Sequence, residues 1–209
     1  MTSEPAPSER RPRERATLGI TPSQTVGPFF AYALTPSDYA FSHLATADLT
    51  AGGGEGERVR LTGRVLDAEG APVADAFVEI WQSDAQGRYS GAGAPGSNAA
   101  FTGFGRAETG PDGGFAFLTI KPASTPGPDG RSQAPHINVG LFARGVLRRL
   151  FTRLYFEDEG SNGGDPVLAL VPEDRRATLI ARRTDDGEPA AYALDIRLAG
   201  EGETVFFEA

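Results

Sequence analysis

The chain has 209 residues, of which 39% are hydrophobic and 23% charged, a composition typical of a globular protein with one sizeable core. It contains no cysteine, which excludes disulfides and thiolate metal sites. The net charge of −8 argues against binding along a nucleic-acid backbone. No apolar run of about 18 residues could span a membrane, and the first residues lack the apolar segment of a secretory signal. We therefore expect a cytoplasmic protein that binds neither nucleic acid nor membrane.

Three regions follow one another along the chain. Residues 1–16 are polar and proline-rich, and we expect them to be disordered. Residues 17–57 contain "TPSQTVGPFF" and "AGGGEGE", which favour an extended arm over a packed element. The pattern changes at residue 58, where we expect a single folded domain that runs to residue 209.

The folded region predicts a succession of short strands. "RVRLTGRVLD" alternates, "ADAFVEIWQ" (74–82) and "GGFAFLTIK" (113–121) are rich in β-formers, and "HINVGLFA", "VLRRLFTRLYF", "PVLAL", "ATLIARR" and "AYALDIRLA" follow. Turn residues separate most of them, so we expect an all-β fold: an antiparallel β-sandwich core with long loops and an extended N-terminal arm. "PEDRRATLI" (172–180) allows one short helical turn.

Two long segments interrupt this pattern, at residues 83–110 and 122–135. Long stretches without regular structure inside a compact domain are usually functional or disordered. Both segments flank the strand that begins with His136, so we expect a site near that residue.

His136 and Asn138 stand two positions apart on the expected strand. Residues i and i+2 of a strand face the same side, so a His-x-His would present two imidazoles to one metal ion. Here the second position offers only an amide oxygen, a weak metal donor. From the residues alone, His136 is either a remnant metal ligand or a hydrogen-bonded structural histidine of a β core.

Arg144 lies in "FARG", where an apolar strand ends at a glycine. A guanidinium in this position could bind a carboxylate with two parallel hydrogen bonds. The alternative is an ordinary edge arginine that pairs with an acidic loop. No cysteine nucleophile, G-x-S-x-G turn or phosphate-binding glycine loop is present to suggest other chemistry.

Several stretches, taken in order, resemble the intradiol ring-cleaving dioxygenases from about residue 18 onward. They are "TPSQTVGPFF", "GRVLDAEGAPVADAFVEIWQSDAQGRY", "FGRAETGPDGGFAFLTIKP", "APHINVGLFARG", "LFTRLYFEDE" and "LDIRLAGEGETVFF". The similarity is greatest to the α chains of the two-chain members that act on protocatechuate. The resemblance implies a β-sandwich, cleavage of protocatechuate with O₂ to 3-carboxy-cis,cis-muconate in the β-ketoadipate route, and assembly of α and β chains into larger oligomers.

The resemblance also implies a non-haem Fe(III), held in the β chain by two tyrosinates, two histidines and a hydroxide. In this chain Tyr89 matches the first tyrosine, and His136 matches the first histidine. The second tyrosine is missing from the segment around Thr125, and Asn138 stands in place of the second histidine. Two of four ligands are absent, so we expect a degenerate metal pocket and no metal bound by this chain.

In the resembling α chains, the working substrate pocket lies at the interface with the β chain. By this resemblance Thr25, Gly27 and Pro28 line that pocket, and Arg144 contacts or guides the carboxylate of protocatechuate. An arm that only crosses between subunits is the alternative for the first three residues. Two other functions also stay open: a self-sufficient dioxygenase using Tyr89, His136 and a carboxylate, and a non-enzymatic β-sandwich scaffold.

Overall fold

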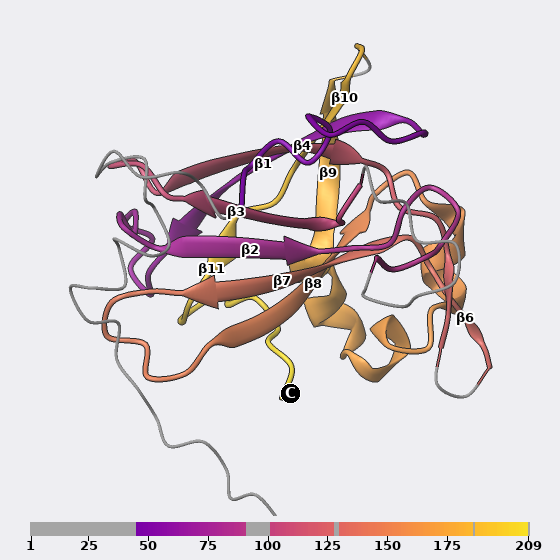
Figure 1. Cartoon of the computed structure of the whole chain (residues 1–209). Coiled ribbons are helices and arrows are strands. Elements are labelled where there is room, and N and C mark those ends of the chain that lie inside the picture. The colour runs from indigo at the N-terminus through magenta and orange to yellow at the C-terminus, as the bar shows by residue number, and fades with distance from the viewer. Residues whose placement is uncertain (1–44, 91–100, 128–129, 186, 209) are drawn as a thin grey trace, which may run out of the picture.

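The computed structural model describes residues 45–90, 101–127, 130–185 and 187–208. Most of the regular secondary structure in the described residues is β-strand (Figure 1). In chain order the strands are β1 (Arg58–Leu66), β2 (Phe77–Trp81), β3 (Phe104–Glu108), β4 (Gly114–Ile120), β5 (Thr125–Pro126), β6 (Ser132–Gln133), β7 (His136–Phe142), β8 (Leu150–Phe156), β9 (Ile180–Asp185), β10 (Ala190–Ala193) and β11 (Ile196–Arg197). Three 3₁₀ helices lie between β8 and β9: η2 (Gly160–Gly164), η3 (Leu168–Leu170) and η4 (Glu173–Leu179).

The main sheet has nine strands, in the order β11-β1-β10-β9-β8-β7-β2-β3 with β4 added beside β1, while β5 and β6 form a separate hairpin. The pairs β1–β4, β2–β3, β2–β7, β7–β8 and β9–β10 are antiparallel. The pairs β1–β10, β1–β11 and β8–β9 are parallel. The all-β expectation is confirmed, and the sheet is mixed because these three parallel pairs stand among the antiparallel ones.

Strand β9 belongs to both halves of the sheet. Its first residues, Ile180 and Ala181, pair with β8, whereas its later residues pair with β10. In Figure 1, β9 and β10 run steeply across the direction of β2 and β7. The sheet therefore turns over on itself at β9, and its two halves enclose one core between them.

The core between the halves is filled by alternate residues of the strands. In β1, Val59 and Leu61 are buried, while Arg58 and Arg60, which alternate with them, are exposed. From the other half, Val78 of β2 and Ile137 of β7 join the same apolar cluster. This alternation places the intervening residues of β2, β7 and β8 on the outer face, where the candidate site lies.

Residues 46–49, which we expected in the extended arm, lie between the free edges of β3 and β4. The carbonyl of Thr46 accepts a hydrogen bond from Arg106 N in β3, at 3.1 Å. Ala47 and Leu49 bond in turn to Leu118 of β4, at 2.9 and 2.8 Å. Leu49 is 6% exposed and packs in the core, so this short segment bridges the two strands.

Two local expectations need correction. Strand β3 lies inside the 83–110 segment, which we expected to be free of regular structure; its residues pair along the full length of β2. The stretch "PVLAL", expected as a strand, ends in helix η3, because Asp165 accepts the backbone N–H groups of Val167 and Leu168 and turns the chain there. The helical turn expected within 172–180 is confirmed as η4.

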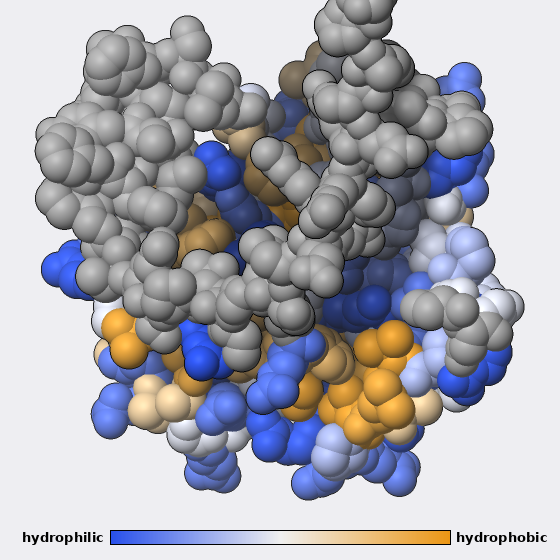
Figure 2. Space-filling model, turned by 60° about the horizontal axis from the view of Figure 1, so that its bottom comes forward, coloured by the Kyte–Doolittle hydropathy of each residue, from blue (hydrophilic) through white to orange (hydrophobic). Residues whose placement is uncertain are grey.

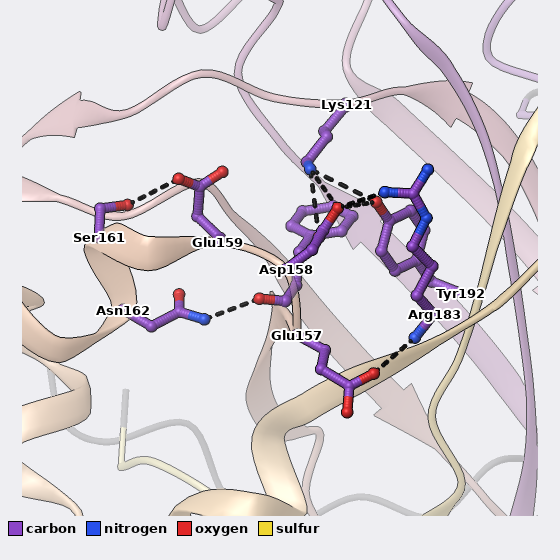
Figure 3. A network of polar contacts seen from close by, with 9 residues as sticks. Lys121, Glu157, Asp158, Glu159, Ser161, Asn162, Arg183 and Tyr192 are labelled. Atoms are coloured by element: carbon purple, nitrogen blue, oxygen red, sulfur yellow. Dashed lines mark hydrogen bonds and ion pairs between the residues drawn. The ribbon is translucent and has the colours of Figure 1, made fainter. Parts of the chain in front are cut away.

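A polar network closes the core where β4 and β8 end (Figure 3). Lys121, the only lysine of the chain, contacts Asp158 at 3.3 Å and the Tyr192 hydroxyl at 3.4 Å. The Tyr192 hydroxyl donates to Asp158 at 2.9 Å, and Arg183 binds the same carboxylate at 2.8 Å. Burial opposes the charge on Asp158, but its Tyr192 and Lys121 contacts outweigh burial and hold its pKa below the usual value. The network joins β4, β8, β9 and β10.

The face turned forward in Figure 2 carries apolar patches among hydrophilic side chains. Over the whole described surface, the large apolar side chains with substantial exposure are Trp81, Leu147 and Leu170. The described residues contain no helix that could span a membrane.

Candidate functional site

The candidate site begins with one row of residues across β2, β7 and β8. Trp81 pairs with Asn138, and Asn138 pairs with Arg153. In the next row His136 pairs with Tyr155. Because directly opposed residues point to the same side of a sheet, these side chains gather at one end of the outer face.

Tyr89 extends over this face from the loop that follows β2. Its hydroxyl lies 3.4 Å from Nε2 of His136 and accepts a hydrogen bond from the Asn138 amide at 3.3 Å. The Tyr89 ring also stacks on Trp81, with ring centroids 6.3 Å apart. The structure thus brings together Tyr89, His136 and Asn138, three of the four positions that the resemblance marked as a degenerate metal pocket.

His136 is buried and has a fixed orientation. Its Nδ1 lies 2.8 Å from the carbonyl oxygen of Ala134, so Nδ1–H donates and Nε2 keeps its lone pair toward Tyr89. Burial lowers the pKa of His136, and the nearby Arg153 guanidinium lowers it further. The ring is therefore neutral at pH 7, in the tautomer that histidine uses to bind metals through Nε2.

Asp165 lies behind the site and fixes the strand that carries His136. Its carboxylate accepts hydrogen bonds from the backbone N–H groups of Ala134, Val167 and Leu168 and from the Tyr155 hydroxyl, at 2.7–3.0 Å. Asp165 is 1% exposed, so these contacts are shielded from water. Burial raises the pKa of Tyr155 far above its usual value, and its hydroxyl stays protonated as a donor.

Arg153 reaches into the site from β8. Its Nη1 donates to Oε1 of Gln133 at 2.8 Å and lies 3.4 Å from the Tyr155 hydroxyl. Within the described part of the chain, no carboxylate forms an ion pair with it. A half-buried positive charge therefore stands beside Asn138 and His136.

Thr125 occupies the segment from which the second tyrosine is missing. It lies in the β5–β6 hairpin opposite Gln133, the residue that holds Arg153. Its side chain is buried, and its hydroxyl has no hydrogen-bond partner among the described residues. A threonine has no phenolate oxygen, and its side chain is shorter than that of the missing tyrosine.

These residues do not fit a ferric ion. The Tyr89 phenol is held neutral, because burial raises its pKa above the usual value, although the Asn138 hydrogen bond and Arg153 oppose this. The Asn138 amide nitrogen donates to Tyr89 and to the carbonyl of Trp81, at 3.2 Å for the latter. Among the described residues, no group of three or more His, Asp or Glu side chains could hold a metal. One imidazole and one neutral phenol next to a guanidinium lack the negative charge that stabilises Fe(III).

Arg144 lies at the other end of β7, roughly 20 Å along the strand from His136. Its guanidinium is 79% exposed and forms an ion pair with Asp75, the residue with a positive φ of 60° that precedes β2. This is the acidic-loop pairing that we left open as an alternative. Arg144 and the degenerate pocket therefore cannot serve the same cavity within this chain.

Arg149, from the same loop, turns back onto the outer face instead. It binds Glu79 at 2.9 Å and lies over the Phe151 ring at 4.4 Å. Gly140 makes this possible, since a side chain there would collide with the Arg149 guanidinium. Glu79 is buried and also pairs with Arg106, at 2.6 Å. These contacts fix the base of the loop and leave Arg144 projecting from it.

Thr25, Gly27 and Pro28 lie outside the described residues. Sequence reasoning also missed three residues of the site: Trp81, Arg153 and Asp165. For Arg153 a signal was available, because "LFTRLYF" alternates and places it on the polar face of its strand. Asp165 gave no such signal, since its role depends on a chain turn that the sequence pattern did not reveal.

Comparisons with known proteins agree with this geometry. A family model described as "Dioxygenase" matches residues 26–200. The chain is 46% identical to the α chain of protocatechuate 3,4-dioxygenase from Burkholderia cepacia, over 92% of this chain and 98% of that one. It is 39% identical to the β chain from the same organism, over 71% of this chain and 67% of that one.

Among solved structures, the dioxygenase domain of a carbohydrate-binding fusion protein from Streptomyces sp. SirexAA-E matches with a TM-score of 0.59 and 25% identity. The match covers 86% of this chain and 98% of that one. A family model that spans most of the chain, near full-length relatives and the shared fold lead to one conclusion. The chain belongs to the intradiol dioxygenase family.

Proposed function

We propose that this chain is the α subunit of a protocatechuate 3,4-dioxygenase and binds no iron itself. It completes the substrate pocket of an iron-bearing β chain, and the pair cleaves protocatechuate with O₂ to 3-carboxy-cis,cis-muconate in the β-ketoadipate route. Fe(III) on the β chain supplies the activation of the catechol toward O₂. The residues of this chain bind the substrate, orient it and exclude water from it.

The observation that carries this proposal is the separation of two features along β7. The metal-type donors at one end are too few and too weakly charged to hold a ferric ion. The arginine suited to a substrate carboxylate stands exposed at the opposite end, paired with Asp75. A chain with this arrangement contributes best to a cavity completed by another chain.

Arg144 has a defined task in this proposal. Protocatechuate carries a carboxylate, and the chain has a net charge of −8 that repels such an anion. A local guanidinium offsets this repulsion at the pocket mouth. Asp75 holds the guanidinium in place before substrate arrives, and the substrate carboxylate replaces or shares that contact. Thr25, Gly27 and Pro28 are the further residues that we propose for the pocket wall.

The test is expression of the full chain alone and together with a β chain from this family. We expect the isolated chain to be colourless, without stoichiometric iron and without activity, and the co-purified pair to carry iron and turn over protocatechuate. A coloured, iron-loaded and active isolated chain would establish the self-sufficient dioxygenase instead. Failure to co-purify with any β chain would favour the non-enzymatic scaffold.

A further inference from the structure

Tyr89, His136 and position 138 converge on one point of the outer face. Nε2 of His136 faces the Tyr89 hydroxyl at 3.4 Å, and the Asn138 amide reaches the same hydroxyl at 3.3 Å. Nδ1 of His136 is already bound to a backbone carbonyl, which leaves Nε2 oriented for a ligand. A single change of Asn138 to histidine would thus bring three donors of the right type together. By donor geometry alone, this chain lies one substitution from a metal site.

Arg153 adds a positive charge at this same point. It pairs directly with Asn138 across β7 and β8, so the Cβ atoms of the two residues lie within about 5.5 Å of each other. Its guanidinium is anchored by Gln133 and Tyr155, so its position is defined. A cation fixed here repels any metal ion that the three donors would hold.

Among the residues that the structure describes, no carboxylate forms an ion pair with the Arg153 guanidinium. Gln133 and Tyr155 are uncharged partners, and Asp165 directs its carboxylate to backbone N–H groups and to the Tyr155 hydroxyl instead. On the same face, by contrast, Arg106 and Arg149 are both paired with Glu79. The unpaired state of Arg153 among the described residues therefore needs another explanation.

We propose that Arg153 is the residue that keeps metal ions out of this chain: its fixed guanidinium replaces the positive charge of a metal beside Tyr89, His136 and Asn138. Loss of ligands alone would leave a weak site able to collect stray divalent ions. An internal cation removes that affinity, so that metal loading is confined to chains without such an arginine. Arg153 thus determines metal specificity by repulsion.

The test starts from Asn138→His, which supplies the third donor. The full chain carrying this change is compared with Asn138→His/Arg153→Gln, using Co²⁺, whose absorbance reports coordination, and Fe³⁺, whose tyrosinate complex is coloured. We expect the double variant to bind Co²⁺ at least about tenfold more tightly, since two like charges a few ångströms apart repel strongly even at the effective dielectric constant of a protein surface. Equal affinity of the single and double variants would overturn the proposal.

Two matched variants separate charge from shape. Asn138→His/Arg153→Lys keeps the positive charge and should bind metal as weakly as Asn138→His alone. Asn138→His/Arg60→Gln removes the positive charge of Arg60, an exposed residue of β1 in the other half of the sheet. Its metal affinity should equal that of Asn138→His alone. A gain in either variant comparable to that of Arg153→Gln would contradict a local effect of Arg153.

A third variant keeps Arg153 in place, in case its replacement prevents folding. Asn138→His/Gln133→Glu puts a carboxylate where Gln133 Oε1 now accepts the guanidinium, and so neutralises the charge with little change of shape. Metal affinity should again rise, and no rise in this folded variant would overturn the proposal. The measurement is independent of the proposed function, because it needs neither a β chain nor turnover.

Discussion

The two ends of β7 carry polar residues of opposite character. At the His136 end, His136, Tyr155 and Asp165 are buried, and the Asp165 carboxylate bonds to the Tyr155 hydroxyl and to the backbone N–H of Ala134. At the Arg144 end, the Arg144 side chain is 79% exposed and forms an ion pair with Asp75. The first end has become part of the fold, and the second is available to another molecule.

The largest difference between the ends should appear in stability when one carboxylate is removed from each. Asp165→Ala leaves several buried donors without an acceptor, and we expect a loss of at least about 3 kcal/mol in the free energy of unfolding. Asp75→Asn, at the exposed end, keeps a residue that tolerates positive φ and should change stability by less than about 0.5 kcal/mol. Urea denaturation of both variants measures the contrast. Similar losses would show that the two ends are not distinct.

The next difference concerns substrate binding in the assembled enzyme. Arg144→Ala should raise KM for protocatechuate about tenfold, as expected for loss of one charge-assisted contact, while the iron content stays unchanged. His136→Gln, at the buried end, should leave KM unchanged as long as the chain folds. Kinetics at low and high salt provide the measurement. Unchanged kinetics of Arg144→Ala at both salt concentrations would remove this residue from the pocket.

The smallest effect is a pH dependence that belongs to the buried end alone. Burial and Arg153 lower the pKa of His136 in the folded chain, so the unfolded chain takes up this proton first. The associated stability is fully present above about pH 6.5, the ordinary histidine pKa, and declines as the pH falls below that value. Thermal unfolding between pH 8 and pH 5 should show a flatter profile for His136→Gln than for the unchanged chain. Parallel profiles would contradict a neutral, buried His136, and His43 cancels because both proteins contain it.

Much of the fold could be predicted from local pattern. Alternation in β1 and in β7, where Ile137, Val139 and Leu141 face the core, identifies both as strands, because the period of two reflects which face is buried. The parallel pairings of β1 with β10 and of β8 with β9 could not be predicted, since they join segments far apart in the chain. Strand β3 was missed because its "FGRAE" gains its strand structure from pairing with β2 and the Thr46 segment, and not from its own propensity.

The candidate site could also be predicted only in part, because local pattern identifies strand residues but does not fix which strands pair. The period of two placed His136 beside Asn138, and the resemblance added Tyr89, so the converging group was anticipated. The pairing of Asn138 with Arg153 depends on strand register, which single-sequence patterns do not fix. Asp75 was not identified as the partner of Arg144, because the two residues are 69 positions apart in the chain.

The segment of residues 46–49 has a practical consequence for protein engineering. It occupies the edges of β3 and β4, and without it both strands would present unpaired N–H and C=O groups. Bare strand edges of this kind pair with other molecules and promote aggregation. A shortened form made to remove the N-terminal arm should therefore begin before Thr46, since a later start would yield a chain prone to self-association whatever its effect on catalysis.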